Sequence, residues 1–168
     1  MERITRRGAM ALGLGGTALL AGCGGKFMHY SGPQVTRVVV QKTERRMFLL
    51  NGATPLEIYD VQLGFRAAGH KQFEGDGKTP EGRYHIDRRN PDSAFYLSIG
   101  IDYPNAADRA FAASHGKSPG GDIFIHGWGD KRRKRSDDWT AGCVAVKNRE
   151  MRQVYAMVMN GTPVDIYA

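Results

Sequence analysis

The chain is interrupted at short intervals by residues that end regular structure, and this limits what it can fold into. It contains 22 glycines and seven prolines among 168 residues. Between these interruptions lie short apolar runs rich in β-branched and aromatic residues, which are typical of strands. The runs predict strands at residues 35–41, 47–50, 56–63, 82–86, 94–99, 122–126 and 164–167. Many short strands favour a β-rich fold, a sandwich or a barrel.

Two segments have the periodicity of a helix. Residues 106–114 predict a short helix, and residues 149–160 predict a longer one with Met151, Val154, Tyr155 and Val158 on its apolar face. Asn148 is suited to cap the second helix, and Gly161 followed by Pro163 is suited to end it. We therefore expect an α+β domain with one or two short helices.

The N-terminus resembles an export signal. Arg3, Arg6 and Arg7 precede a short apolar stretch that is too short to span a membrane as a mature helix. The sequence Leu20-Ala21-Gly22-Cys23 resembles a bacterial lipobox, in which the cysteine is acylated and becomes the first residue. We expect residues 1–22 to be a lipoprotein signal peptide that loosely resembles the twin-arginine type, 23–34 to be a tether and 35–168 to be a single folded domain. The alternative is an ordinary secretory peptide with an incidental cysteine.

Export also limits the binding partners that the net positive charge of the domain favours. Removing residues 1–22 lowers the formal charge from +7 to +5 and leaves enough chain for one domain with a core. A basic exported domain favours anionic envelope polymers or acidic lipids, and nucleic acid is not expected. The run Lys131–Arg135 predicts a solvated basic loop. His85 and Asp87 have no second ligand cluster, so no metal or other cofactor is expected.

Cys143 and His126 are the candidate chemical groups. The chain has two cysteines, so lipidation of Cys23 leaves Cys143 as a free thiol in an oxidising compartment, where an unused thiol is a liability. The alternative is an inert buried thiol. One β-type run ends at His126 and another follows Cys143, so a shared sheet would place the imidazole where it can take the thiol proton. Gly142 leaves space and a tight backbone for an oxyanion site, and Thr140 can hold the turn.

These residues belong to a longer pattern. The pair His126-Gly127, followed by Thr140-Ala141-Gly142-Cys143-Val144, resembles the signature of the YkuD-type L,D-transpeptidases, and the C-terminal part resembles their YafK-like branch. The resemblance runs from about residue 36 to the C-terminus. It includes Lys78-Thr79-Pro80-Glu81-Gly82, Arg89-Asn90-Pro91-Asp92-Ser93, Tyr103-Pro104-Asn105 and Pro119-Gly120-Gly121-Asp122.

The resemblance implies a β-rich cysteine acyltransferase that acts on peptidoglycan stem peptides through a thioester. Cys143 would be the nucleophile and His126 the acid and base, with Thr140 and Gly142 completing the catalytic set. Gly127, Ala141, Trp139 and Tyr103 would contact the substrate, although Ala141 stands where many members have histidine. We expect a monomer in the periplasm, tethered to a membrane through Cys23.

Two other functions remain open. Water in place of an amine would give an L,D-endopeptidase or amidase that hydrolyses peptidoglycan or lipoprotein–peptidoglycan links. An inactive, lipid-anchored peptidoglycan-binding module is the third possibility.

Overall fold

The computed structural model describes residues 25–130 and 137–168. The predictions for Cys23 and for the run Lys131–Arg135 lie outside these residues. Within the described part, no helix is both long enough and apolar enough to cross a membrane.

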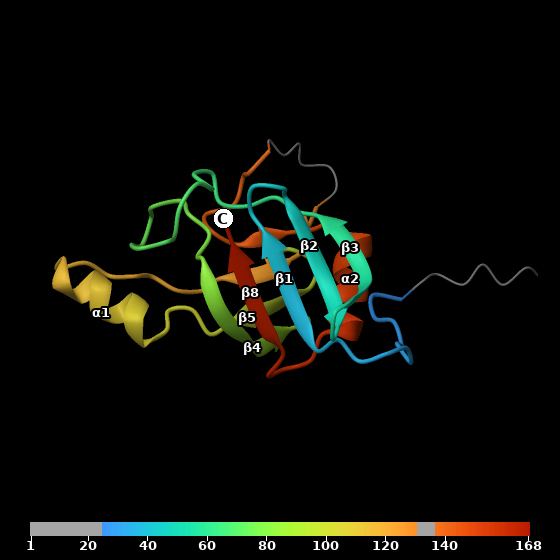
Figure 1. Ribbon diagram of the computed structural model, residues 1–168. Coiled ribbons are helices and arrows are strands. Elements are labelled where there is room, and N and C mark those ends of the chain that lie inside the picture. The colour runs from blue at the N-terminus through green and yellow to red at the C-terminus, as the bar shows by residue number, and fades with distance from the viewer. Residues whose placement is uncertain (1–24, 131–136) are drawn as a thin grey trace, which may run out of the picture.

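A single curled sheet forms the body of the protein (Figure 1). In the described residues it has eight strands, in the spatial order β3-β2-β1-β8-β4-β5-β6-β7. Their bounds are β1 Arg37–Gln41, β2 Arg46–Asn51, β3 Thr54–Asp60, β4 Gly82–Asn90, β5 Ser98–Ile101, β6 Phe124–His126, β7 Val144–Ala145 and β8 Pro163–Tyr167. Beyond the end of β3, Gln62 pairs with Ala145 of β7, so the two edges of the sheet meet. The β-rich fold predicted from the sequence is confirmed.

Strand β1 lies inside the sheet because its sequence is apolar on both faces. Val38, Val39 and Val40 are all buried between β2 and β8. A continuous β-branched run of this kind is typical of a strand that is covered on both sides. Strands β1 and β2 pair antiparallel, as the hairpin that the charged residues between the two apolar runs favour.

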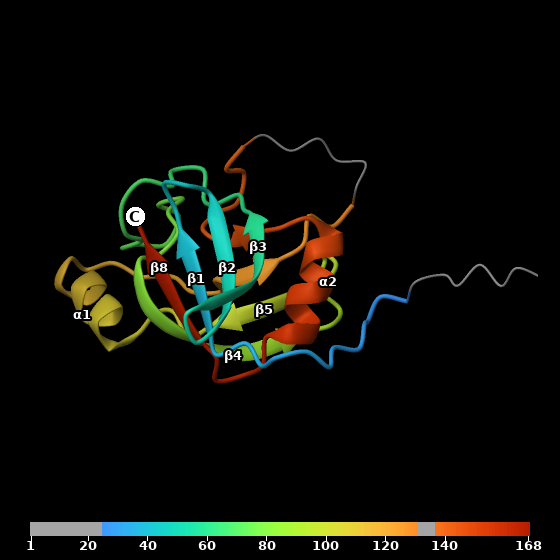
Figure 2. The ribbon, with the colours of Figure 1, turned by 45° about the vertical axis from the view of Figure 1, so that its right-hand side comes forward.

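Two helices flank the sheet in the described residues. Helix α1 (Ala106–Ser114) has the predicted bounds, and Asn105 and Asp108 close a capping box at its start. It projects from one side of the sheet in Figure 1. Helix α2 (Asn148–Met157) packs its apolar face on β5 and β6, as the turned view in Figure 2 shows.

Helix α2 differs from its prediction at both ends. Lys147 is the N-cap, and the side chain of Asn148 instead bonds to both the N–H and the carbonyl of Gly129. At the other end, the helix stops before the predicted residue 160. The guanidinium of Arg89 donates to the carbonyls of Tyr155 and Val158 and takes the place of further helical bonds.

Strand β5 begins four residues later than predicted. Residues 94–97 form a turn instead, in which the Ser93 hydroxyl accepts from the N–H of Phe95 and Tyr96 has a φ of +79°. Strand β4 is correspondingly longer than predicted, because Arg88, Arg89 and Asn90 pair with β5. This extension brings polar side chains of β4 to the edge of the candidate site.

Candidate active site

A row of four residues crosses the sheet and ends at the candidate nucleophile. Arg88 of β4 faces Gly100 of β5, and Gly100 faces Phe124 of β6. Strand β7 runs parallel to β6, with Val144 beside Ile125, which places Cys143 beside Phe124. The N–H of Phe124 points at the Cys143 Sγ across 3.4 Å.

A second row lies two residues further along the same face. Asn90 faces Ser98, and Ser98 faces His126. Because side chains on one face of a strand recur every second residue, about 7 Å apart, His126 and Phe124 project to the same side. The sheet therefore places the imidazole one step from the row that ends at Cys143.

The two rows enclose one cavity of about 250 Å³. It is lined by Asn90, Ser93, Phe95, Ser98, Asp122, Phe124, His126 and Cys143. The structure thus brings together Cys143 and His126, the two residues that the sequence predicts as the thiol and its base, which are 17 positions apart in the chain.

The orientation of His126 fixes which of its nitrogens is basic. Its Nδ1 lies 2.6 Å from the carbonyl oxygen of Gly127. A carbonyl can only accept a hydrogen bond, so Nδ1 carries the proton and Nε2 is the basic atom. The ring is stacked on Phe95 at 4.5 Å and meets Trp139 edge-on at 5.6 Å between centroids. These contacts hold the imidazole plane in place.

Gly127 is required by close packing behind the imidazole. A Cβ at this position would lie 2.6 Å from the carbonyl oxygen of Phe95 and 2.7 Å from the Oδ1 of Asn148. The Asn148 amide in turn holds the loop at Gly129. The carbonyl of Gly127 also accepts from Nδ1 of His126, so Gly127 helps to orient the imidazole, and its contact with substrate stays a prediction.

Thr140 ties the nucleophile turn together. Its hydroxyl donates to the carbonyl of Cys143 at 2.7 Å and accepts from the N–H of Gly142 at 3.1 Å. The Gly142 N–H is therefore engaged, and the N–H groups of Cys143 and Ala141 are the remaining donors for an oxyanion. Ala141 is exposed beside the turn.

The turn is also fixed by two neighbouring segments. The N–H of Thr140 donates to the carbonyl of Leu63, and the N–H of Phe65 donates back to the carbonyl of Thr140. Gly142 has a φ of +139°, and a Cβ there would lie 2.6 Å from the carbonyl oxygen of Lys78. Gly142 is thus needed for backbone approach to Lys78, in keeping with the tight backbone predicted there, and the space it leaves for substrate stays a prediction.

An ion pair anchors the turn from its N-terminal side. The carboxylate of Asp138 accepts from the Arg45 guanidinium at 2.6 to 3.1 Å, and from the N–H of Leu63 at 2.9 Å. Both Arg45 and Asp138 have positive φ angles, of 54° and 49°. The sequence analysis did not identify this pair, because its members are 93 residues apart.

The environment of Cys143 favours the protonated thiol. Burial raises the pKa of Cys143 above its usual value, and the hydrogen bond from the Phe124 N–H opposes this only in part. The thiol also points at the carbonyl of Asp122, 3.5 Å away. This environment therefore does not favour a standing thiolate with a lowered pKa.

The remaining predicted contacts divide into two groups. Trp139 packs against His126, as described. Tyr103 is buried outside the cavity lining, where its hydroxyl donates to the carbonyl of Pro119 and its ring packs on Tyr84. Its position favours a structural role, in holding the segment that leads to Asp122. The sequence analysis did not single out Phe95, Ser98 or Asp122 as site residues.

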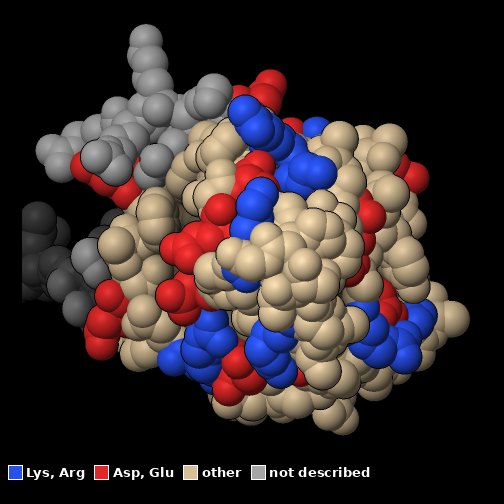
Figure 3. All heavy atoms as spheres, turned by 90° about the vertical axis from the view of Figure 1, so that its left-hand side faces the viewer, with Lys and Arg blue, Asp and Glu red and all other residues tan. Residues whose placement is uncertain are grey.

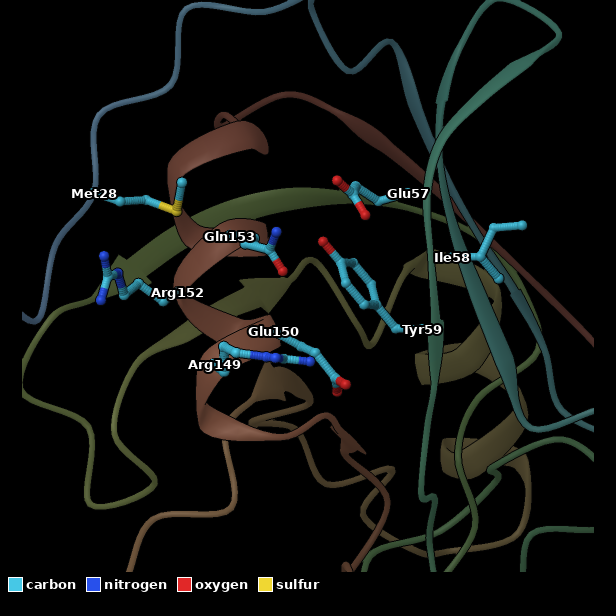
Figure 4. A pocket seen from close by; sticks show the side chains of 8 residues that line it. All are labelled: Met28, Glu57, Ile58, Tyr59, Arg149, Glu150, Arg152 and Gln153. Carbon is cyan, nitrogen blue, oxygen red and sulfur yellow. The ribbon is translucent and has the colours of Figure 1, made fainter. Parts of the chain in front are cut away.

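Larger hollows lie elsewhere on the surface. One of about 580 Å³ lies between β3 and α2, where Tyr59 points toward the helix that carries Arg149, Glu150 and Gln153 (Figure 4). It contains neither the thiol nor the imidazole. On the face that carries α1, basic and acidic side chains are interspersed rather than gathered into a field of one sign (Figure 3). The small cavity at Cys143 is therefore the candidate site on chemical grounds.

Comparison with known proteins agrees with this site. The family model described as the YkuD L,D-transpeptidase catalytic domain matches residues 35–166. YafK from Escherichia coli K12, provisionally named as an L,D-transpeptidase, is 38% identical over 105 residues, which cover 61% of this chain and 37% of YafK. The matched region is thus little more than a third of that relative.

Two solved structures with the same fold match most of this chain at lower identity. Pgp2 from Campylobacter jejuni, described as a helical cell shape determining protein, is 27% identical with a TM-score of 0.64, over 82% of this chain and 49% of Pgp2. Bd1075 from Bdellovibrio bacteriovorus is 26% identical with a TM-score of 0.58, over 80% of this chain and 48% of Bd1075.

Proposed function

Because the chain belongs to the family of YkuD L,D-transpeptidase catalytic domains, we propose that it transfers acyl groups of peptidoglycan stem peptides through a thioester on Cys143. The observation that carries the proposal is the shared cavity of Cys143 and His126, with the His126 Nδ1 proton committed to Gly127. That arrangement gives a nucleophile, and a base whose reactive nitrogen is defined.

Acylation would begin from the protonated thiol. As the Sγ of Cys143 attacks the donor carbonyl, Nε2 of His126 takes the thiol proton and then gives it to the departing amine. The imidazolium formed in between is stabilised by its Nδ1–H bond to the Gly127 carbonyl. Because burial disfavours an isolated thiolate, proton removal would accompany attack rather than precede it.

The negative oxygen of the tetrahedral intermediate needs donors near the nucleophile. The N–H of Cys143, with that of Ala141, would supply them, since the N–H of Gly142 is bonded to Thr140. One well-placed donor lowers such a barrier by about 3–4 kcal/mol. Deacylation by an amine gives a crosslink, and deacylation by water gives hydrolysis.

The similarity to Pgp2, whose description names cell shape, supports a role in the cell envelope. The lipobox-like segment ending at Cys23 supports tethering of the mature domain to a membrane on the exported side. On these grounds we propose that the protein acts on the wall in the periplasm, and a monomer stays our expectation.

Incubation with defined muropeptides tests the proposal. The purified protein and its Cys143→Ala variant are given a tetrapeptide donor, and products are resolved by mass. A thioester adduct and products in the wild type alone support an acyltransferase. Crosslinked products indicate transpeptidation, and shortened peptides alone indicate hydrolysis. Bound but unchanged muropeptide, with no adduct on Cys143, would instead identify a binding module.

A further inference from the structure

Beside the candidate nucleophile, the structure holds a charged pair that the acylation step leaves unused. Asp122 lines the cavity, and its side chain is 91% exposed where the cavity opens to solvent. Its Oδ1 lies 3.3 Å from the Nη2 of Arg88. We infer that Asp122, positioned by Arg88, binds the ammonium group of the amine that resolves the thioester. This inference rests on the proposed function.

Arg88 is held in a slot made for it. A Cβ on Gly100 would lie 2.6 Å from the Arg88 Cγ and 2.8 Å from its Nε, so the side chain lies across the sheet only because residue 100 is glycine. The guanidinium is stacked on the ring of Phe124 at 4.5 Å. Its Nη2 then extends to Asp122. The row from β4 to β6 therefore directs a fixed cation at the cavity opening.

Asp122 is fixed at its backbone as well. It has a φ of +54°, which is uncommon for a residue other than glycine. This conformation directs its carbonyl at the Cys143 thiol, 3.5 Å away, while the side chain extends to solvent. Strained residues of this kind concentrate at functional sites. The residue whose carbonyl contacts the Cys143 thiol thus also carries the exposed carboxylate.

The charge of the cluster selects an ammonium ion. The Nη1 of Arg88 already donates to both carboxylate oxygens of Asp87, at 2.9 and 2.7 Å. One guanidinium therefore faces two carboxylates, Asp87 and Asp122, and the cluster carries one excess negative charge. A carboxylate ligand would find the Arg88 guanidinium already bonded to Asp87 and Asp122. An ammonium ion could instead bind the exposed carboxylate oxygens of Asp122.

The step that Asp122 would assist balances as follows. An ammonium ion held by Asp122 loses one proton to solvent, and the resulting amine attacks the thioester carbonyl. A C–N bond forms and the C–S bond breaks. Nε2 of His126 takes the second amine proton and returns it to Sγ, so the products are an amide, the Cys143 thiol and one proton in solvent.

The test measures how one acyl-enzyme divides between amine and water. The wild type, Asp122→Asn, Arg88→Gln and the control Asp60→Asn are acylated with the same donor. Asp60 is exposed and pairs with Arg46 outside the cavity lining. Each acyl-enzyme then receives one of two amines. Glycinamide is mostly a cation at neutral pH, whereas hydroxylamine is mostly uncharged. Product ratios are read by mass at low salt and at 1 M salt.

We expect Asp122→Asn to lower the ratio of aminolysis to hydrolysis with the cationic amine by about two- to fivefold, which is the range of exposed ion pairs. High salt should bring the ratios of the wild type and Asp122→Asn closer together, because it screens the charge of Asp122. Arg88→Gln should lower the same ratio, because Asp122 loses its fixed position, and Asp60→Asn should leave it unchanged.

Two results would overturn the inference while the proposed function stands. The first is an Asp122→Asn acyl-enzyme with the same ratio of aminolysis to hydrolysis as the wild type. The second is an equal loss with hydroxylamine, which would show that charge recognition is not involved. If the wild type forms no acyl-enzyme at all, the proposed function fails instead.

Discussion

The hydroxyl of Thr140 bridges two peptide groups of the nucleophile turn, donating to the carbonyl of Cys143 at 2.7 Å while accepting from the N–H of Gly142. This single side chain closes the turn that directs Sγ into the cavity. It also engages the N–H of Gly142, which is then not available as an oxyanion donor.

Replacing Thr140 with valine keeps the shape of the side chain and removes both bonds. Two buried polar groups lose their partner, so we expect the free energy of unfolding to fall by about 1–3 kcal/mol. Acylation should slow as the turn loosens. Urea unfolding and acyl-enzyme formation measure the two effects. Thr162→Val is the matched control, because Thr162 is buried and makes no side-chain bond to the described residues. Equal losses in the two variants would contradict this account.

Gly142 allows a test of close approach against backbone strain. In Gly142→Ala the new Cβ would meet the Lys78 carbonyl at 2.6 Å, in addition to a φ of +139°. Gly161→Ala has a positive φ of 84° and nothing within 4 Å, so it isolates the strain, which costs about 1–2 kcal/mol. We expect Gly142→Ala to be the less stable by thermal denaturation, and to lose acylation. A Gly142→Ala variant as stable as Gly161→Ala would show that the turn can move away from Lys78.

The carboxyl of Asp76 is expected to contribute to the stability that the fold loses at low pH. Burial tends to raise the pKa of its carboxyl, but bonds from the N–H groups of Phe73, Gln72 and Lys78 and from Lys71 lower the pKa below its usual range. Because the folded-state pKa lies below the unfolded value of about 3.9, its stabilisation is present above that pH and is lost as the pH falls through the folded value.

We therefore expect Asp76→Asn to be less stable than the wild type at pH 7 and to lose less stability on acidification to pH 3. Urea unfolding at both pH values measures this. Asp92→Asn serves as control, since Asp92 is exposed. An Asp76→Asn variant whose stability falls with pH as steeply as the wild type would rule out Asp76 as a contributor.

The strands and the identity of the thiol and base could be read from the sequence because they depend on local patterns. Alternating runs and turn residues are local, and so is the capping box of α1. The family signature added the pairing of His126 with Cys143. The bounds of α2 could not be read in the same way, because its end depends on Arg89, which lies 66 residues before Tyr155.

The supporting parts of the site were not predictable for the same reason. The stacking of Phe95 on His126 depends on a turn that the sequence pattern described as a strand. The slot for Arg88 depends on register between β4 and β5, and the ion pair of Arg45 with Asp138 joins distant segments. Burial of Cys143, which sets the direction of its pKa shift, also emerges only when the sheet has curled.

The lipobox prediction has its own test, outside the described residues. If Cys23 is acylated, the full chain expressed with its signal segment should partition into the detergent phase. Cys23→Ala should then be found in the aqueous phase. Cys143→Ala is the control that keeps the lipid site and should partition as the wild type does. Unchanged fractionation of Cys23→Ala would exclude the anchor.

The role of His126 is tested by replacing it with glutamine, which keeps a hydrogen-bonding side chain and removes the proton acceptor. The raised pKa of Cys143 leaves the thiol protonated at neutral pH, so acylation there depends on Nε2. We expect a fall of about 10²–10⁴-fold.

Part of that loss should return at higher pH, where the thiol ionises without help, and the rate of Cys143 alkylation should rise over the same range. His85→Gln is the matched control, because His85 is exposed and pairs with Asp102 away from the cavity lining. Acylation rates from pH 6 to 10, about the range that spans both ionisations, are measured with a melting curve for each protein. A folded His126→Gln variant with the wild-type pH profile would remove His126 from the mechanism. The cations of Lys71 and Arg88, which both lower the pKa of Cys143, would then be the groups that favour the thiolate.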